Sequence, residues 1–230
     1  SYRITFWKRR GILERISKDA CRYDSSNARN SLYYQGEEIG MTNPHYTSIE
    51  QYADVESRNY YEILLNEGKT KEEALEILAA RSRDNSRTPM QWTDERYCGF
   101  SDTKPWIPVS DNFEKINVKK QKQDRDSILE FYKKLIMLRK EKEVIARGNI
   151  EFMEVENAGV LAYTRCLDKQ KLLVCCNFRD VESQMEFTQE WKSGRKILGN
   201  YEENHKNNYK VLTLRPYEII VLEKAKNKMT

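Results

Sequence analysis

Hydrophobic side chains recur with a helical period in three stretches of the first two thirds of the chain. The first stretch covers Ile49–Leu65. The second follows Thr70 and Glu73, whose spacing is that of a capping box, in which each side chain binds the backbone N–H of the other residue. The third covers Ile128–Leu138 and shows the clearest helical stripe. The pattern therefore predicts three helices before residue 145.

Two features surround the third helix. Either Asp124 or Asp126 is suited to cap its N-terminus, and Gly148 marks its end. The segment before it, residues 84–118, shows little periodicity and contains Pro89, Pro105 and Pro108. A long loop without secondary structure inside a compact domain is usually functional. We therefore expect this loop to contribute to a functional surface.

After residue 148 the hydrophobic period shortens to two, which is the period of a β-strand. Turn residues such as Asp168-Lys169 separate the alternating segments. Helices followed by a run of strands indicate two domains rather than one mixed sheet, and we place the boundary at 146–150. The predicted strands are Ile150–Val155, Val160–Arg165, Lys171–Phe178, Lys210–Leu214 and Glu218–Glu223.

The composition narrows the class of protein without indicating a partner. The 230 residues include 40 lysines and arginines against 36 aspartates and glutamates, which gives a formal net charge of +4. Hydrophobic residues make up 39% of the chain, and this excludes a disordered or collagen-like chain. No run of about twenty apolar residues is present to span a membrane, and the balanced charge argues against nucleic-acid binding.

Five cysteines and two histidines are scattered along the chain, and no two cysteines have the C-x-x-C spacing of a metal or redox site. Cys175 and Cys176 are neighbours within an apolar segment, which favours buried free thiols in a reducing compartment. We therefore expect a cytoplasmic protein without a bound metal or cofactor.

Six motifs follow one another along the chain: Tyr34–Asn43, Arg83–Trp92, Pro105–Ile107, Lys115–Val118, Asp126–Lys140 and Leu214–Glu218. In this order they resemble the oligo-1,6-glucosidase and α-glucosidase branch of the α-amylase family of glycoside hydrolases. Trehalose-6-phosphate hydrolases share most of these motifs. The ten-residue motif Arg83–Trp92 is highly specific, whereas any one of the others alone would be weak.

The resemblance implies a fold. Members of this family consist of a (β/α)₈ TIM barrel followed by a small antiparallel β-domain. Tyr33–Gly40 would be the eighth barrel strand, residues 41–122 its long loop on the catalytic face, and residues 124–142 the last barrel helix. The fold class of the chain is then α+β. Its domains would be the C-terminal part of the catalytic barrel at 34–147, an antiparallel β-sandwich at 148–224 and a tail at 225–230.

The resemblance also implies a reaction, retaining hydrolysis of a glycosidic bond by a nucleophilic carboxylate and a carboxylic acid. In the family these two groups and a third, sugar-binding aspartate lie on barrel strands before the eighth. The Asn-His-Asp motif that carries the last of them is absent from this sequence. No acidic residue of the chain inherits a catalytic role, so we expect the chain alone to be inactive.

Arg87 is the first candidate for substrate binding. In the family, the arginine at this place of the Arg83–Trp92 motif binds the glucose on the non-reducing side of the scissile bond. A guanidinium suits that task because its fixed fork of donors bridges neighbouring hydroxyl groups. The alternative is a structural arginine that pairs with Asp84 or another carboxylate of the loop.

Glu56 is the second candidate for substrate binding. It lies on the first predicted helix, where relatives place acidic residues that line the acceptor subsites. The alternative, a solvent-exposed glutamate on a helix surface, is favoured. For Trp92 and Trp106, stacking on sugar rings is an option, but burial within the proline-rich loop is favoured.

The expected function is that of a C-terminal fragment of an exo-acting glucosidase. Its intact form would release glucose from α-1,6- or α-1,4-linked oligosaccharides, and the oligosaccharide would be its partner. Two alternatives stay open. One is a fragment of a trehalose-6-phosphate hydrolase, and the other is a non-catalytic β-module that binds carbohydrate or serves as a structural domain.

Residues 1–33 differ from the family pattern, which places an apolar helix and Gly-Thr-Pro-Tyr-Ile before the motif that starts at Tyr34. Codons for Lys8–Leu32 can be chosen so that the frame displaced by one base spells KEEEYWKESAKMHAVMIHPMQGTPY, a string of the family type. We therefore predict that residues 1–33 are an out-of-frame translation of a damaged glucosidase gene. Sequencing of the coding DNA tests this prediction, and a displaced frame that spells anything else contradicts it.

Overall fold

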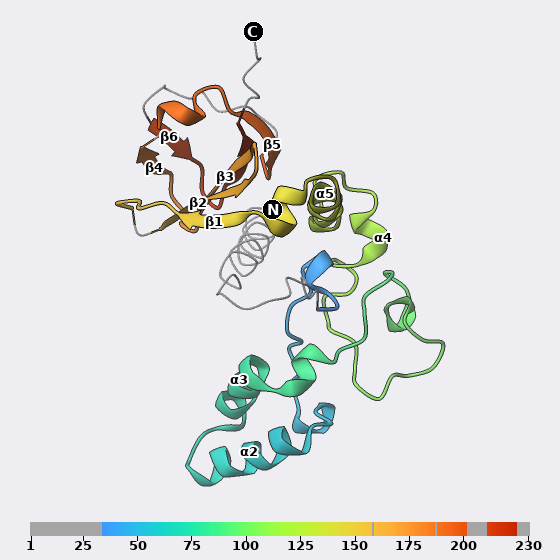
Figure 1. Ribbon diagram of the computed structural model, residues 1–230. Helices are drawn as coiled ribbons and strands as arrows, with labels where there is room; N and C mark the ends of the chain where they lie inside the picture. Colours follow the sequence, from blue (N-terminus) through green and yellow to red (C-terminus); the bar gives the residue numbers. More distant parts are fainter. Residues whose placement is uncertain (1–33, 158, 187, 202–210, 225–230) are drawn as a thin grey trace. The chain divides into compact units, whose positions relative to one another are not determined.

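The computed structural model describes residues 34–157, 159–186, 188–201 and 211–224. These residues belong to two compact units, one over Tyr33–Glu130 and one from Phe131 onward (Figure 1). The predicted out-of-frame segment, residues 1–33, lies outside the described residues. The domain limits given above, at 147/148 and 224/225, stay predictions.

The first unit begins with a turn and not with a strand. The predicted barrel strand Tyr33–Gly40 is wrong for residues 34–40, which form a turn and the 3₁₀ helix η1 (Glu37–Ile39). Gly36 and Gly40 have φ angles of 88° and 69°, which glycine adopts without steric cost. A strand needs a neighbouring strand to pair its backbone groups, and no described residue of this unit supplies one.

A helical hairpin follows, formed by α2 (Val55–Asn66) and α3 (Lys71–Arg81), which lie side by side (Figure 1). The first predicted helix is divided into η2 (Ile49–Gln51) and α2, because Asp54 caps α2 by accepting from the N–H of Ser57 at 3.0 Å. The predicted capping box at Thr70 and Glu73 is confirmed, with hydrogen bonds of 2.9 and 3.1 Å.

The core of the hairpin combines aromatic and aliphatic side chains. Tyr46 and Tyr52 meet edge to face, with ring centroids 5.0 Å apart, an arrangement that aromatic pairs prefer. These two residues and four others form one buried cluster: Tyr61, Leu64, Ala74 and Leu78. The hairpin therefore has a hydrophobic core of its own.

Between α3 and the first strand, the described residues form η3 (Arg83–Ser86), η4 (Arg96–Gly99), α4 (Val118–Gln121), α5 (Ile128–Glu141) and α6 (Glu143–Arg147). The predicted N-cap of α5 at Asp124 or Asp126 is wrong. The hydroxyl of Ser127 accepts from the N–H of Glu130 at 3.2 Å, whereas Asp124 accepts from the N–H of Asp126 within the preceding turn. Helix α5 therefore begins two residues after the later of the two aspartates.

The described residues of the second unit include seven antiparallel strands: β1 (Asn149–Phe152), β2 (Val160–Leu167), β3 (Gln170–Asn177), β4 (Ser183–Glu186), β5 (Arg195–Gly199), β6 (Val211–Leu214) and β7 (Ile219–Glu223). They form one sheet in the order β1-β2-β3-β7-β5 and a second sheet of β4 and β6 (Figure 1). All five predicted strands are present. Strands β4 and β5 were not predicted from the sequence.

The two sheets share one hydrophobic core, as the predicted sandwich requires. The larger sheet contributes Leu173 and the smaller sheet Leu214, both fully buried, and Trp191 of the 3₁₀ helix η5 (Gln189–Trp191) lies in the same cluster. Cys175 and Cys176 are buried and free, as predicted, and burial raises the pKa of the Cys175 thiol to about 12. The α+β fold class is confirmed: helical segments precede an antiparallel β-domain.

The packing of Leu173 between the sheets gives a testable expectation. Leu173→Ala leaves a cavity in a fully buried position, so it should lower the free energy of unfolding by about 2–5 kcal/mol. The exposed position Gln184 on β4 is the control, where Gln184→Ala should change it by less than about 0.5 kcal/mol. Guanidinium unfolding followed by circular dichroism measures both. Equal effects of the two substitutions would contradict this packing.

Candidate functional site

Arg87 directly follows the 3₁₀ helix η3. Its backbone N–H donates to the carbonyl of Asp84 at 3.0 Å. Its guanidinium Nη1 lies 3.8 Å from the Asp84 Oδ1, and 47% of its side chain is exposed. The guanidinium therefore faces a carboxylate on one side and solvent on the other. Both predicted interpretations of Arg87, a partner for Asp84 and an accessible donor group, are compatible with this position.

Asp84 is completely buried. Its Oδ2 accepts from the backbone N–H groups of Ala53 and Asp54 at 2.7 and 2.8 Å, so it holds the chain just before α2. Its own N–H donates to the hydroxyl of Ser82 at 3.2 Å. The two backbone amides compensate part of the buried negative charge of Asp84. Through these hydrogen bonds Asp84 connects the start of α2 to the loop that carries Arg87.

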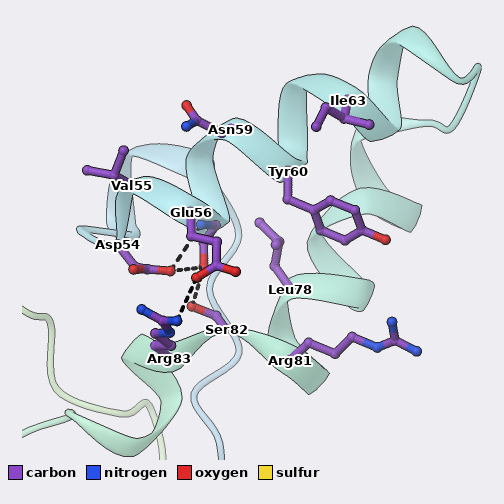
Figure 2. A pocket seen from close by; sticks show the side chains of 11 residues that line it. Asp54, Val55, Glu56, Asn59, Tyr60, Ile63, Leu78, Arg81, Ser82 and Arg83 are labelled. Carbon is purple, nitrogen blue, oxygen red and sulfur yellow. Dashed lines mark hydrogen bonds and ion pairs between the residues drawn. The ribbon is translucent and has the colours of Figure 1, made fainter.

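Glu56 lies in the first turn of α2 and points toward η3 (Figure 2). Its Oε2 is 3.0 Å from Nη2 of Arg83, and both side chains are about two thirds exposed. An exposed ion pair of this kind contributes at most about 1 kcal/mol to stability. Glu56 is therefore an accessible carboxylate with one cationic neighbour, as the favoured interpretation of an exposed glutamate predicts.

A pocket of about 620 Å³ opens between α2 and the end of α3 (Figure 2). Glu56 and Arg83 line one part of it, and the Tyr60 ring, Ile63 and Arg81 line another. Arg87 is not among the lining residues. The structure therefore brings Glu56 together with Arg83, and the connection between Glu56 and Arg87 runs through the backbone contacts of Asp84.

The electrostatics of the site depend on hydrogen bonds at the start of α2. The hydroxyl of Ser57 donates to Oδ2 of Asp54 at 2.7 Å, and this bond is the main cause that lowers the pKa of Asp54. Nearby, burial raises the pKa of Tyr52, and the negative charge of Asp84 raises it further. A phenol beside a buried carboxylate stays protonated at neutral pH.

Both tryptophans of the long loop are accessible. Trp92 is 48% exposed and Trp106 is 77% exposed, so the prediction that they are buried is wrong. Exposed indole rings are available for stacking. Among the residues that the structure describes, no three histidine, cysteine or acidic side chains form a group that could hold a metal ion, and no described helix is long and apolar enough to cross a membrane.

Two protein-family models match the chain, and together they cover most of it. Residues 4–148 match the alpha-amylase catalytic domain, and residues 150–221 match the C-terminal domain of maltogenic amylase. This chain belongs to the alpha-amylase family. The catalytic-domain match begins at residue 4 and so includes most of the predicted out-of-frame segment 1–33, whose reading frame stays a prediction for DNA sequencing.

Named relatives of this alpha-amylase family chain fall into two groups. The oligo-1,6-glucosidase of Bacillus cereus is 39% identical over 193 residues, which are 83% of this chain and 34% of that protein. The trehalose-6-phosphate hydrolase of Escherichia coli is 41% identical over 194 residues, which are 81% of this chain and 34% of that protein. The chain thus spans about a third of the length of these relatives, in their C-terminal part.

Solved structures agree with this assignment to the alpha-amylase family. The trehalose-6-phosphate hydrolase of Bacillus licheniformis superposes with a TM-score of 0.77 at 41% identity, over 84% of this chain and 35% of that one. The isomaltulose synthase of Klebsiella gives a TM-score of 0.76 at 27% identity, over 95% of this chain and 38% of that one.

Two residues of the site were not recognised as site residues in the sequence. The sequence indicates Asp84 only as a possible partner of Arg87 and assigns no role to Arg83. Both residues lie inside the specific motif Arg83–Trp92. Their contacts with Ala53, Asp54 and Glu56 join segments about thirty residues apart, and no local pattern carries that information.

The cap of α2 gives a pH-dependent expectation. The folded-state pKa of Asp54 lies below its ordinary value, so its contribution to stability is complete at neutral pH and is lost as the pH falls below about 4. Ser57→Ala removes the main cause and should raise this pKa. The control is Ser48→Ala, whose hydroxyl instead donates to Glu50 at 2.6 Å and should leave Asp54 unchanged. NMR titration of the Asp54 carboxyl carbon measures the shift, and an unchanged value in Ser57→Ala would contradict the assignment.

Proposed function

We propose that this chain is the C-terminal part of an exo-acting α-glucosidase of the oligo-1,6-glucosidase type. The intact enzyme would release glucose from α-1,6- or α-1,4-linked oligosaccharides. The observation that carries the proposal is 39% identity to an oligo-1,6-glucosidase over 193 of the 230 residues, together with the accessible Arg87 in the most specific motif of the chain.

In this proposal Arg87 binds the terminal glucose and Glu56 faces the acceptor part of the substrate. The support for Arg87 is its half-exposed guanidinium, whose planar donors match vicinal hydroxyl groups. The support for Glu56 is its exposed carboxylate at the edge of the pocket between α2 and α3. The exposed rings of Trp92 and Trp106 are additional stacking groups.

The chain alone should not hydrolyse glycosides. Retaining hydrolysis needs two carboxyl groups about 5–5.5 Å apart. In the first unit, the acidic groups of the site are committed elsewhere: Asp84 to backbone amides, Asp54 to Ser57 and Glu56 to Arg83. The chain also spans only about a third of its relatives. We therefore assign it substrate contacts and no catalytic group.

The free cysteines support a cytoplasmic location. Cys98, Cys166, Cys175 and Cys176 are all unpaired in the described part of the chain, as expected in a reducing compartment.

A trehalose-6-phosphate hydrolase is the second candidate, because the E. coli enzyme of that name is 41% identical over 194 residues. Grafts decide between the two candidates. Residues 34–230 replace the matching C-terminal part of an oligo-1,6-glucosidase in one graft and of a trehalose-6-phosphate hydrolase in the other. The graft that retains the larger share of its parent's kcat/KM identifies the group to which the chain belongs.

Substitution of Arg87 in the graft with the Bacillus cereus oligo-1,6-glucosidase tests the proposed sugar contact. Arg87→Ala should lower kcat/KM for isomaltose by about ten- to a hundredfold, because hydrogen bonds from a charged group are worth about 1.5–3 kcal/mol. The control is Arg125→Ala, at an exposed position in the turn before α5, which should stay within about twofold. An active graft that tolerates Arg87→Ala would contradict the role of Arg87.

The predicted inactivity of the 230-residue chain has its own test. Turnover of p-nitrophenyl α-glucoside by the unaltered chain would contradict that prediction.

A further inference from the structure

The carboxylate of Asp84 has one oxygen that the protein does not satisfy. Oδ2 is fully used by the N–H groups of Ala53 and Asp54. Oδ1 is buried and accepts no hydrogen bond from any described residue. A charged oxygen withdrawn from water is costly unless a cation or donor faces it. The cation that faces Oδ1 is the guanidinium of Arg87, at 3.8 Å.

The geometry of this pair is not that of a closed salt bridge. An arginine that serves only as a structural partner commonly forms two short parallel hydrogen bonds to the carboxylate. Here the separation of 3.8 Å exceeds hydrogen-bond distance, so Asp84 attracts Arg87 without consuming its donors. The half of the Arg87 side chain that is exposed keeps those donors available to a ligand.

Asp84 is itself held firmly in place. Its N–H donates to the hydroxyl of Ser82 at 3.2 Å, and that hydroxyl lies within hydrogen-bond distance, 2.8 Å, of the hydroxyl of Ser57 on α2. Ser57 and Ser82 are both buried. The carboxylate therefore sits on a network that joins α2 to the end of α3, and its position does not depend on Arg87.

We propose that Asp84 is the positioning residue of Arg87. Its buried carboxylate fixes the start of α2 through one oxygen and directs the guanidinium of Arg87 through the other. The proposal rests on the proposed function, in which Arg87 binds the terminal glucose. Asp84 touches no sugar itself. It determines the direction from which the Arg87 donors approach the hydroxyl groups.

The first test measures the Asp84–Arg87 contact in the 230-residue chain and needs no enzymatic activity. Asp84→Asn keeps an oxygen for the amides of Ala53 and Asp54 but removes the charge. Phenylglyoxal condenses with accessible guanidine groups, and the carboxylate beside Arg87 restricts the orientations in which that group meets the reagent. Modification of Arg87, followed by mass spectrometry, should therefore be at least about threefold faster in Asp84→Asn, the effect expected from loss of a partly exposed ion pair.

Arg96 is the internal control for this reaction. It is an exposed residue of the same unit, and its Nη2 donates to the phenol oxygen of Tyr97 at 2.7 Å, a contact that shares no group with Asp84. Acceleration at Arg87 alone supports the proposal. Equal acceleration at Arg96 and Arg87 reports a loosened fold and overturns the proposal, as does an unchanged rate at Arg87.

A salt titration of the unaltered chain covers the case in which Asp84→Asn does not fold. Salt screens the attraction between a carboxylate and a partly exposed guanidinium. Raising sodium chloride to about 1 M should speed the modification of Arg87 relative to Arg96, whose partner is the neutral phenol of Tyr97. A rate ratio that does not change with salt overturns the proposal.

The second test asks whether the contact matters for the sugar, in the oligo-1,6-glucosidase graft. Asp84→Asn should lower kcat/KM for isomaltose at least about threefold when Arg87 is present, and should cost nothing further in the Arg87→Ala background. An equal loss in both backgrounds indicates a merely structural role and overturns the proposal. A graft without activity refutes the proposed function, while the modification rates still decide whether Asp84 directs Arg87.

Discussion

A buried carboxylate can be tolerated only if its surroundings replace the water that it has lost. At Asp84 two backbone amides and a serine hydroxyl hold the residue, and a guanidinium stands beside the remaining oxygen. The organisation of the first unit follows from this constraint. The start of α2 is drawn to the end of α3, Glu56 comes beside Arg83, and Arg87 is left facing outward.

The two units meet the requirement for backbone pairing in different ways. In the β-domain every strand pairs with a neighbour from the same domain, and the two sheets cover each other around Leu173 and Leu214. In the first unit the described residues form only helices, turns and loops, and the large side chains of Trp92 and Trp106 are exposed. The described residues of this unit therefore leave large side chains accessible and do not form a closed sheet or barrel.

Much of the fold could be predicted from the sequence because the informative patterns are local. The capping box at Thr70 and the apolar alternation of β2 and β3 involve neighbouring residues, and both are present as predicted. Strand β4 was missed because it has only four residues, and just Ser183 and Met185 face inward. Strand β5 was missed because it begins with Arg195-Lys196 and is interrupted by an irregularity in its pairing with β7.

The features that the sequence did not reveal depend on contacts between distant residues. The break between η2 and α2 combines the cap at Asp54 with a distant contact, because the amide of Asp54 donates to Asp84, thirty residues further along the chain. No hydrophobic period can indicate such a break.

The contacts of the candidate site also could not be predicted from local sequence patterns. The specific motif Arg83–Trp92 indicates Arg87 as a site residue. It does not indicate whether the Arg87 guanidinium is buried, free or bound to a neighbour, because that depends on where the Asp84 carboxylate lies in the folded chain. The position of Asp84 answers this question: its carboxylate is near enough to orient the guanidinium and too far to occupy it. An arginine in this state combines a defined direction with unused donors, which is what recognition of a neutral, hydroxyl-rich ligand requires.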